Sequence, residues 1–265
     1  MSLRLTVIFL LLCAVASAQV GRRVMSPRPP NPDQPMRPID HRDDGFAFCT
    51  LQFESDRMEQ SGTGWATDYP RAGQHMLLRL PEITTATVTE DQWVVNLDDD
   101  RVFECPMIFA SDVGTMNLSD DQSFRLNDYL TKGGLLWVDD FWGYQSHAQW
   151  LREVSKFDTD GWRIMTPSSD HQLYWIHYHI AETLQMPNLN FWKGTNGLTA
   201  ERGLESPVTP LRVILDNDDR IVVVITRNTD IFDAWEKETD PAFFEAFAPK
   251  GYGLGVNVIL CAMAC

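Results

Sequence analysis

Carboxylate side chains follow three apolar segments that have the length and composition of buried strands. They are Asp112, after residues 107–110; Asp139 and Asp140, after residues 135–138; and Asp230, after residues 221–226. Ligands of open α/β sheets bind beyond the carboxyl ends of the strands, so these side chains could share one crevice. Carboxylate oxygens suit a divalent cation, and all four residues are candidate metal ligands. In the alternative interpretation each aspartate caps its own turn or helix and meets none of the others.

Adjacent Asp139 and Asp140 are expected to have different roles. Neighbouring side chains of an extended strand point to opposite faces, so at most one of these carboxylates should face the crevice directly. We expect the other to cap the following turn.

A dense run of glycine, aromatic and charged residues occupies positions 64–72, directly before an expected helix. Asp68 could cap that helix while Trp65 and Tyr69 pack as a lid. In a binding interpretation Arg71 would pair with a crevice carboxylate or with an anionic ligand. Together with Trp142, these side chains offer the aromatic rings and carboxylates that suit the faces and hydroxyls of a carbohydrate.

Three histidines, His171, His177 and His179, lie in the aromatic-rich segment 170–179. His177 and His179 would share one face of a strand, as in some metal sites, but would diverge on a helix. The interleaved aromatic residues favour packing roles. The sequence has no Gly-x-Ser-x-Gly elbow, glycine-rich phosphate loop or His-Glu-x-x-His motif, and so lacks the usual signals of serine hydrolases, nucleotide-binding proteins and zinc proteases.

Patterns of strands and helices alternate along the chain between these residues. Strands are predicted over residues 46–53, 84–89, 107–110, 135–138 and 221–226. Ser119 and Gln122 form a capping box that opens a helix closing at Gly133 and Gly134. Strand, helix and strand in this order predict a right-handed parallel crossover.

Further helices are predicted after Pro70, over about residues 146–157 and from Gly255 onward. Residues 211–215 and 221–225 flank an acidic turn and predict an antiparallel hairpin. The predicted fold class is therefore α/β, with a mostly parallel sheet flanked by helices and an antiparallel hairpin addition.

The N-terminal residues predict export. Residues 1–18 combine a basic residue, an apolar run and the small-residue pattern Ala16-Ser17-Ala18 of a signal peptide, and the run is short for a membrane anchor. Residues 19–44 are rich in proline and charge, which predicts a disordered tether, and residues 45–265 are expected to form a single domain. We expect a periplasmic or extracellular protein with no stable membrane insertion after signal cleavage.

The net charge of the chain limits the classes of partner that it is expected to bind. The chain carries 22 basic and 37 acidic residues, a formal net charge of −15. Such a surface repels nucleic acid and anionic lipid and favours cations, sugars or basic partners, although acidity also serves solubility alone.

Four cysteines follow the expected signal peptide: Cys49, Cys105, Cys261 and Cys265. Their spacing argues against a structural zinc site. One or two disulfides could form in an oxidising compartment, but Cys49 and Cys261 lie in apolar runs, where a buried thiol is the commoner outcome.

Several motifs together resemble a known family. They are residues 64–70, residues 133–143, Asp170-His171, Asn228-Thr229-Asp230 and Trp235-Glu236. From about residue 46 to residue 263 the chain resembles the bacterial domain-of-unknown-function family numbered 4159. The resemblance implies a fold similar to class I glutamine amidotransferases, and hence flavodoxin-like, with no established activity. Amidotransferases carry a nucleophilic cysteine in a Gly-x-Cys-x-Gly turn; no cysteine here has that setting, so this activity is not expected.

Three functions remain open. The first is an exported domain whose crevice near Trp65, Asp68, Arg71, Asp139, Asp140 and Trp142 binds a small molecule, a carbohydrate or an envelope protein. The second is a metal-assisted hydrolase in which Asp139, Asp140 and Asp230 hold the ion and His171 is the general base. The third is a structural subunit of an envelope assembly, which would expose a large apolar patch. No cofactor is expected beyond a divalent cation.

Overall fold

The computed structural model describes residues 45–60, 62–157, 160–180 and 184–264. The predicted signal peptide, residues 1–18, and the predicted tether, residues 19–44, lie outside the described residues.

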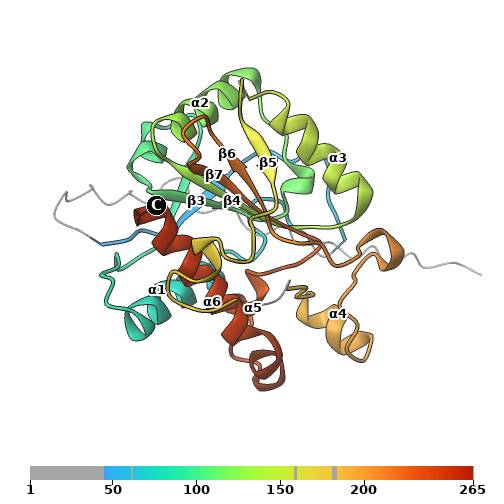
Figure 1. Ribbon diagram of the computed structural model, residues 1–265. Coiled ribbons are helices and arrows are strands. Elements are labelled where there is room, and N and C mark those ends of the chain that lie inside the picture. The colour runs from blue at the N-terminus through green and yellow to red at the C-terminus, as the bar shows by residue number, and fades with distance from the viewer. Residues whose placement is uncertain (1–44, 61, 158–159, 181–183, 265) are drawn as a thin grey trace, which may run out of the picture. The chain divides into compact units, whose positions relative to one another are not determined.

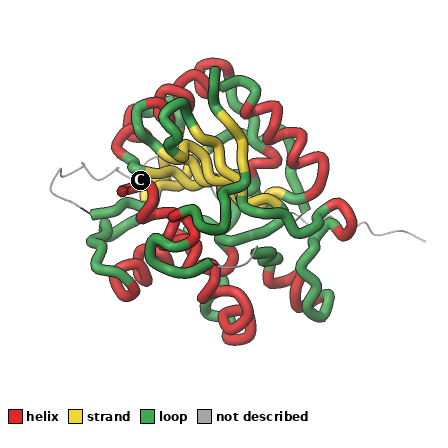
Figure 2. Tube along the Cα trace, in the orientation of Figure 1, coloured by secondary structure: helices red, strands yellow, loops and turns green. Residues whose placement is uncertain are grey.

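A seven-stranded mixed sheet forms the centre of the fold (Figures 1 and 2). The strands are β1 Cys49–Gln52, β2 Trp93–Asn96, β3 Met107–Ala110, β4 Leu135–Phe141, β5 Arg163–Met165, β6 Arg212–Leu215 and β7 Ile221–Arg227. Their order is β2-β1-β3-β4-β7-β6-β5; the first five are parallel, and β5, β6 and β7 pair antiparallel. The parallel part has the flavodoxin-like order. The predicted fold class and the hairpin addition are confirmed.

Helices cover both faces of the sheet. They are α1 Arg71–Ile83, α2 Asp120–Thr131, α3 Gly143–Val154, α4 Leu189–Gly194, α5 Asp233–Glu236 and α6 Pro241–Ala264, with 3-10 helices η1 Asp100–Glu104, η2 Val113–Thr115, η3 Gln172–Tyr174 and η4 Gly203–Glu205. Figure 1 shows α2 and α3 on one side of the sheet and α1, α5 and α6 on the other. The alternation along β4 explains this arrangement, because Trp137 joins the core under α1 and α6 while Leu136 and Val138 join the core under α2 and α3.

Local signals located several elements correctly. β3 spans the predicted residues, and α2 begins with the predicted capping box of Ser119 and Gln122. The strand expected over residues 84–89 is wrong: α1 continues to Ile83, Val88 forms only an isolated bridge with Phe46, and β2 follows at Trp93. β5 was not predicted; it is short and largely exposed.

A disulfide joins Cys49 and Cys105, with 6.2 Å between their Cα atoms. The expectation of a buried thiol at Cys49 is therefore wrong. Parallel pairing of β1 with β3 aligns Cys49 with Ile108, three residues after Cys105, and this non-local pairing brings the two cysteines together. The bond is typical of an oxidising compartment. Cys261 is buried, as expected.

The C-terminal helix begins at Pro241, well before the predicted Gly255. Residues 241–263 have the length and composition of a membrane span. Most of this segment is buried against the rest of the fold, as in the core helix of a water-soluble domain.

Candidate metal centre

Three carboxylates from distant parts of the chain converge at the carboxyl end of the parallel strands. Asp68, Asp140 and Asp230 each offer one oxygen, and these oxygens lie within 4.8 Å of one another. Asp68 and Asp230 are buried and Asp140 is half-buried. We call these three residues the open acidic group. The interpretation that each strand-end aspartate meets none of the others does not hold for them.

A β-bulge decides how Asp139 and Asp140 lie. Val138 is aligned with Ile225, but Phe141 is aligned with Arg227, so β4 contains one residue more than β7 between these pairs. Asp140 has φ of 52°, and the bulge breaks the alternation from which we expected the two side chains to point to opposite faces. The like charge of Asp68 acts on both carboxylates.

Within the bulge the two residues have different partners. Asp140 lines the crevice, and its Oδ1 accepts a hydrogen bond of 2.7 Å from Trp142 Nε1. Asp139 is fully buried, and its Oδ2 accepts from the backbone N–H of Phe232 at the start of α5. Its Oδ1 is buried without a hydrogen-bond partner among the described residues. Asp139 thus meets the helix that follows β7 and not the turn that follows β4.

Asp68 reaches the group from the loop before α1. Its φ is 66°, and its carboxylate accepts a hydrogen bond from Ser111 at the end of β3. Pro70 is the N-cap of α1, without a side-chain cap, so the prediction that Asp68 caps this helix is wrong.

Asp112 lines the same crevice beside the open acidic group. Its φ is 52°, and its Oδ2 accepts a hydrogen bond of 2.9 Å from Gly64 N. Asp112, Asp140 and Asn228 lie at or near strand ends and Asp68 lies in the loop before α1, and all four are non-glycine residues with positive φ. Such strained conformations concentrate at functional sites.

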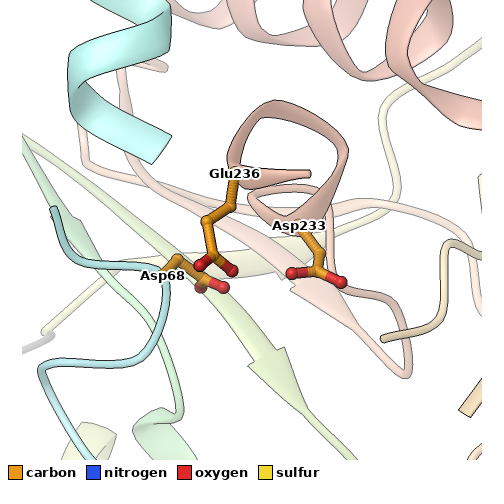
Figure 3. A group of neighbouring side chains, drawn as sticks. All are labelled: Asp68, Asp233 and Glu236. Carbon is orange, nitrogen blue, oxygen red and sulfur yellow. The ribbon is translucent and has the colours of Figure 1, made fainter. Parts of the chain in front are cut away.

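A second acidic group shares Asp68 with the first. Figure 3 shows Asp233 and Glu236 on α5 with their carboxylates directed toward Asp68, and one oxygen from each of the three lies within 4.8 Å of the others. Lys237 Nζ hydrogen-bonds Glu236 and lies 3.6 Å from Asp233 Oδ1. We call Asp233, Glu236 and Lys237 the lysine-paired group. It was not predicted, although acids at positions 230, 233 and 236 repeat every three residues.

Burial dominates the electrostatics. It raises the pKa of Asp68 from 3.8 to about 7, with Glu236 as the next contribution, and it raises the pKa of Asp112 to about 7. Burial and the charges of neighbouring acids hold the pKa values of Asp140 and Asp230 well above their ordinary range. Phe232, whose backbone N–H donates to Asp139, packs against Trp137 with ring centroids 5.2 Å apart, and such apolar packing contributes to the burial.

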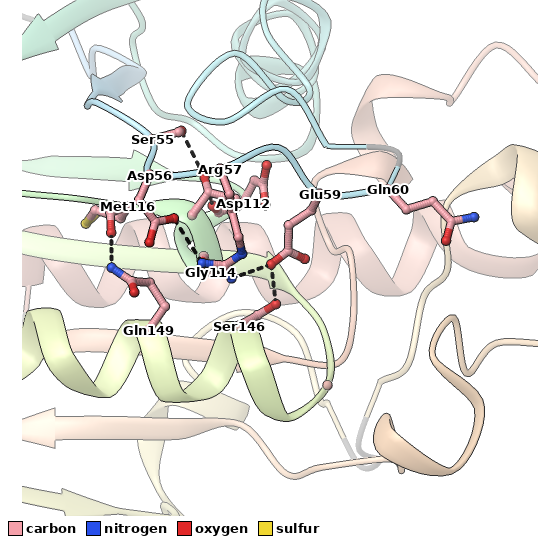
Figure 4. Close-up of polar contacts among 12 residues, drawn as sticks. Ser55, Asp56, Arg57, Glu59, Gln60, Asp112, Gly114, Met116, Ser146 and Gln149 are labelled. Carbon is pink, nitrogen blue, oxygen red and sulfur yellow. Dashed lines mark hydrogen bonds and ion pairs between the residues drawn. The ribbon is translucent and has the colours of Figure 1, made fainter. Parts of the chain in front are cut away.

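Charged residues at the rim are already paired with one another. Arg57 hydrogen-bonds Glu59 at 2.7 Å, and Glu59 also accepts from Ser146 on α3 (Figure 4). Arg202 lies 3.5 Å from Glu201 and 3.9 Å from Glu59. The room between these walls is about 10 Å³, close to the minimum for one water molecule.

Other predicted site residues lie elsewhere or face another way. Trp65 and Tyr69 are half-buried and contact each other, with ring centroids 5.5 Å apart, and neither lines the crevice. Arg71 is exposed on the first turn of α1. His171 caps η3 by accepting from Leu173 N, and does not line the crevice. Trp142 lines the crevice and is buried.

A family model described as a domain of unknown function, DUF4159, matches residues 51–263. No curated protein is significantly similar to the chain. The matched residues cover every strand of the sheet except the first two residues of β1, and include both acidic groups. The chain therefore belongs to the DUF4159 family of domains of unknown function.

Proposed function

We propose that this protein is an exported domain that binds one divalent cation through Asp68, Asp140 and Asp230. The proposal depends on the convergence of these three carboxylates within 4.8 Å. Calcium, magnesium and manganese ions are bound by such oxygen ligands.

The charge balance supports a cation. Buried carboxylates of like charge cannot all ionise at neutral pH without a compensating partner. No basic residue is among the main influences on Asp140 or Asp230; burial and other acids raise both pKa values. A bound cation would supply the missing positive charge and allow the group to ionise.

Asp139 provides a second line of support. Burial raises the pKa of Asp139, and hydrogen bonding by Thr226 and by the backbone of Asp140 only partly opposes that effect. Asp139 Oδ1 has no close hydrogen-bond partner among the described residues, and the charge of Asp139 acts on both Asp140 and Asp230. Buried polar atoms without a close partner are rare in folded proteins and call for an explanation. A water molecule bound to the ion would provide one.

The size of the crevice favours an ion over the carbohydrate considered from sequence. About 10 Å³ of free space suits a single ion or water, whereas a sugar ring needs a much larger opening with an aromatic platform. Trp142 is 4% exposed and cannot present such a face.

Export is the part of the proposal that depends on residues 1–18 and on the disulfide. A bond between Cys49 and Cys105 would persist in the periplasm or outside the cell, where thiols oxidise. Intact mass of protein recovered from the envelope should give a mature chain beginning at Gln19.

Calorimetric titration with Ca²⁺, Mg²⁺ and Mn²⁺ tests the cation site. We expect one equivalent of at least one of these ions to bind. At 100 times Kd, binding should stabilise the domain by about 2.7 kcal/mol, because only the native state binds. Asp140→Asn should abolish the response, since it removes a ligand charge while its Oδ1 can still accept from Trp142.

Asp218→Asn is the matched control. Asp218 is an exposed acid in the turn between β6 and β7, so this variant should retain wild-type affinity. If no ion binds the wild type, or if both variants respond alike, the proposed function is wrong.

A further inference from the structure

A second cavity lies on the α6 side of the sheet, near the open end of the β6–β7 hairpin. It has a volume of about 420 Å³, within the range of small-molecule sites. Leu211, Ile231 and Leu254 form part of its wall, and Tyr174, Trp175 and Asp170 come from the segment around η3.

The polar groups of the inner wall are satisfied within the fold. Thr226 Oγ1 accepts from Trp137 and donates to Val138 O, Thr229 Oγ1 accepts from Met186 N, and Thr209 donates to Arg227 O. A ligand would therefore meet an interior that is effectively apolar. Its body should be hydrocarbon, because a polar body would lose hydrogen bonds to water without replacement.

The segment around η3 has a different character. Trp175 is 52% exposed, and its ring stacks on that of His179 with ring centroids 3.7 Å apart. Asp170 is also exposed, and a hydrogen bond from Ser168 lowers the pKa of its carboxyl, so it carries a negative charge. The described residues that line the cavity include no lysine or arginine.

We propose that this cavity binds a small apolar molecule with a cationic amine at one end. The hydrocarbon part would occupy the space between Leu211, Ile231 and Leu254. The ammonium would lie near Asp170 and the aromatic face of Trp175, which attract a cation through charge and cation–π interaction. An anionic end would meet no lysine or arginine side chain there.

The cavity is distinct from the metal centre. Thr229 and Ile231 line the cavity, whereas Asp230 between them lines the crevice. One short segment after β7 thus contributes alternate residues to two sites, and the second site does not depend on a bound cation.

Three probes of similar size and different charge test the proposal on the full-length mature protein: benzylamine, benzyl alcohol and benzoate. Dissociation constants come from NMR titration at neutral pH, with EDTA present so that cation binding does not contribute. We expect benzylamine to bind at least ten times more tightly than benzoate, with benzyl alcohol between them.

Two exposed positions allow variants that should fold normally. Asp170→Asn should weaken benzylamine about tenfold and leave benzyl alcohol unchanged, whereas Trp175→Ala should weaken both. Phe124→Ala removes an exposed ring from α2, which packs on the opposite face of the sheet, and should change neither. The proposal is wrong if no probe binds the wild type, if benzoate binds as tightly as benzylamine, or if Asp170→Asn leaves benzylamine binding unchanged.

Discussion

Both acidic groups around Asp68 bury several carboxylates close together, but they differ in whether the protein itself provides a compensating positive charge. In the lysine-paired group, burial raises the pKa of Asp233, but the positive charge of Lys237 opposes that effect. In the open acidic group, the main influences on Asp140 and Asp230 all raise the pKa. One group contains its own cation, whereas the proposed function supplies the other with a cation from solution.

This difference shows why a count of acids does not identify a metal site. Asp68 brings one oxygen within 4.8 Å of those of Asp140 and Asp230, and likewise of those of Asp233 and Glu236. In the lysine-paired group the ammonium of Lys237 already compensates part of the negative charge. A metal ion there would have to compete with this ammonium. The informative feature is the buried negative charge that remains without a protein partner.

The pH dependence of the metal-free protein should show the largest effect. Asp68 and Asp112 have folded-state pKa values of about 7, raised from 3.8. Between these values the native state retains protons that the unfolded state has lost, so stability is greatest at low pH and falls as pH rises toward 7. From pH 5.5 to pH 8 we expect a loss on the order of 3 kcal/mol in urea denaturation with EDTA.

Saturating cation should remove most of that loss, because ionised carboxylates are the form that binds metal. Asp68→Asn should make the loss of stability of the metal-free protein with rising pH smaller, and the remaining loss should come from Asp112. A metal-free wild type that is more stable at pH 8 than at pH 5.5 would contradict this account.

Replacing Lys237 should leave the lysine-paired group without a compensating charge, as in the open acidic group. Lys237→Met leaves Asp233 and Glu236 without their ammonium partner, and we expect a loss of about 2 kcal/mol. This is less than the full cost of breaking a buried pair, because the lysine is partly exposed. The variant should also bind a second equivalent of divalent cation in calorimetric titration.

Lys193→Met is the matched control, since Lys193 pairs with Asp240 at the surface. It should cause little change in stability and no new binding. Equal stability of the two variants would mean that Lys237 does not compensate the buried acids.

The smallest expected effects are on stability and cation affinity in variants of the two neighbouring bulge residues, Asp139 and Asp140. Asp139→Ala leaves the Phe232 N–H without its acceptor, which should cost about 1–2 kcal/mol in urea denaturation. Cation affinity should stay within a few-fold of the wild type. Asp140→Asn should show the reverse pattern, with affinity lost and metal-free stability kept or raised. If Asp139→Ala loses cation binding as completely as Asp140→Asn, Asp139 is itself a ligand.

Much of the fold follows from local patterns. The apolar run of β3 and the capping box of α2 each depend on a few neighbouring residues, and the sequence analysis located both. β2 was not predicted and the disulfide pairing was left open, because both depend on distant partners. β2 is defined by pairing with β1, and Cys49 meets Cys105 only through the pairing of β1 with β3.

Some features of the candidate site also follow from local patterns, whereas others depend on distant contacts. The apolar runs predict that Asp112 and Asp230 follow strands, and because parallel strands end at one edge, they also indicate a shared crevice. The prediction that Asp139 and Asp140 follow their strand is wrong, because β4 continues through both residues to Phe141. Which carboxylates meet depends on contacts that no local pattern contains. The bulge redirects Asp140, and the left-handed backbone at Asp68 turns its carboxylate toward Ser111 and the strand ends. Lys237 pairs with Asp233 and Glu236. These outcomes depend on register, backbone conformation and burial, which arise from contacts between segments distant in the chain.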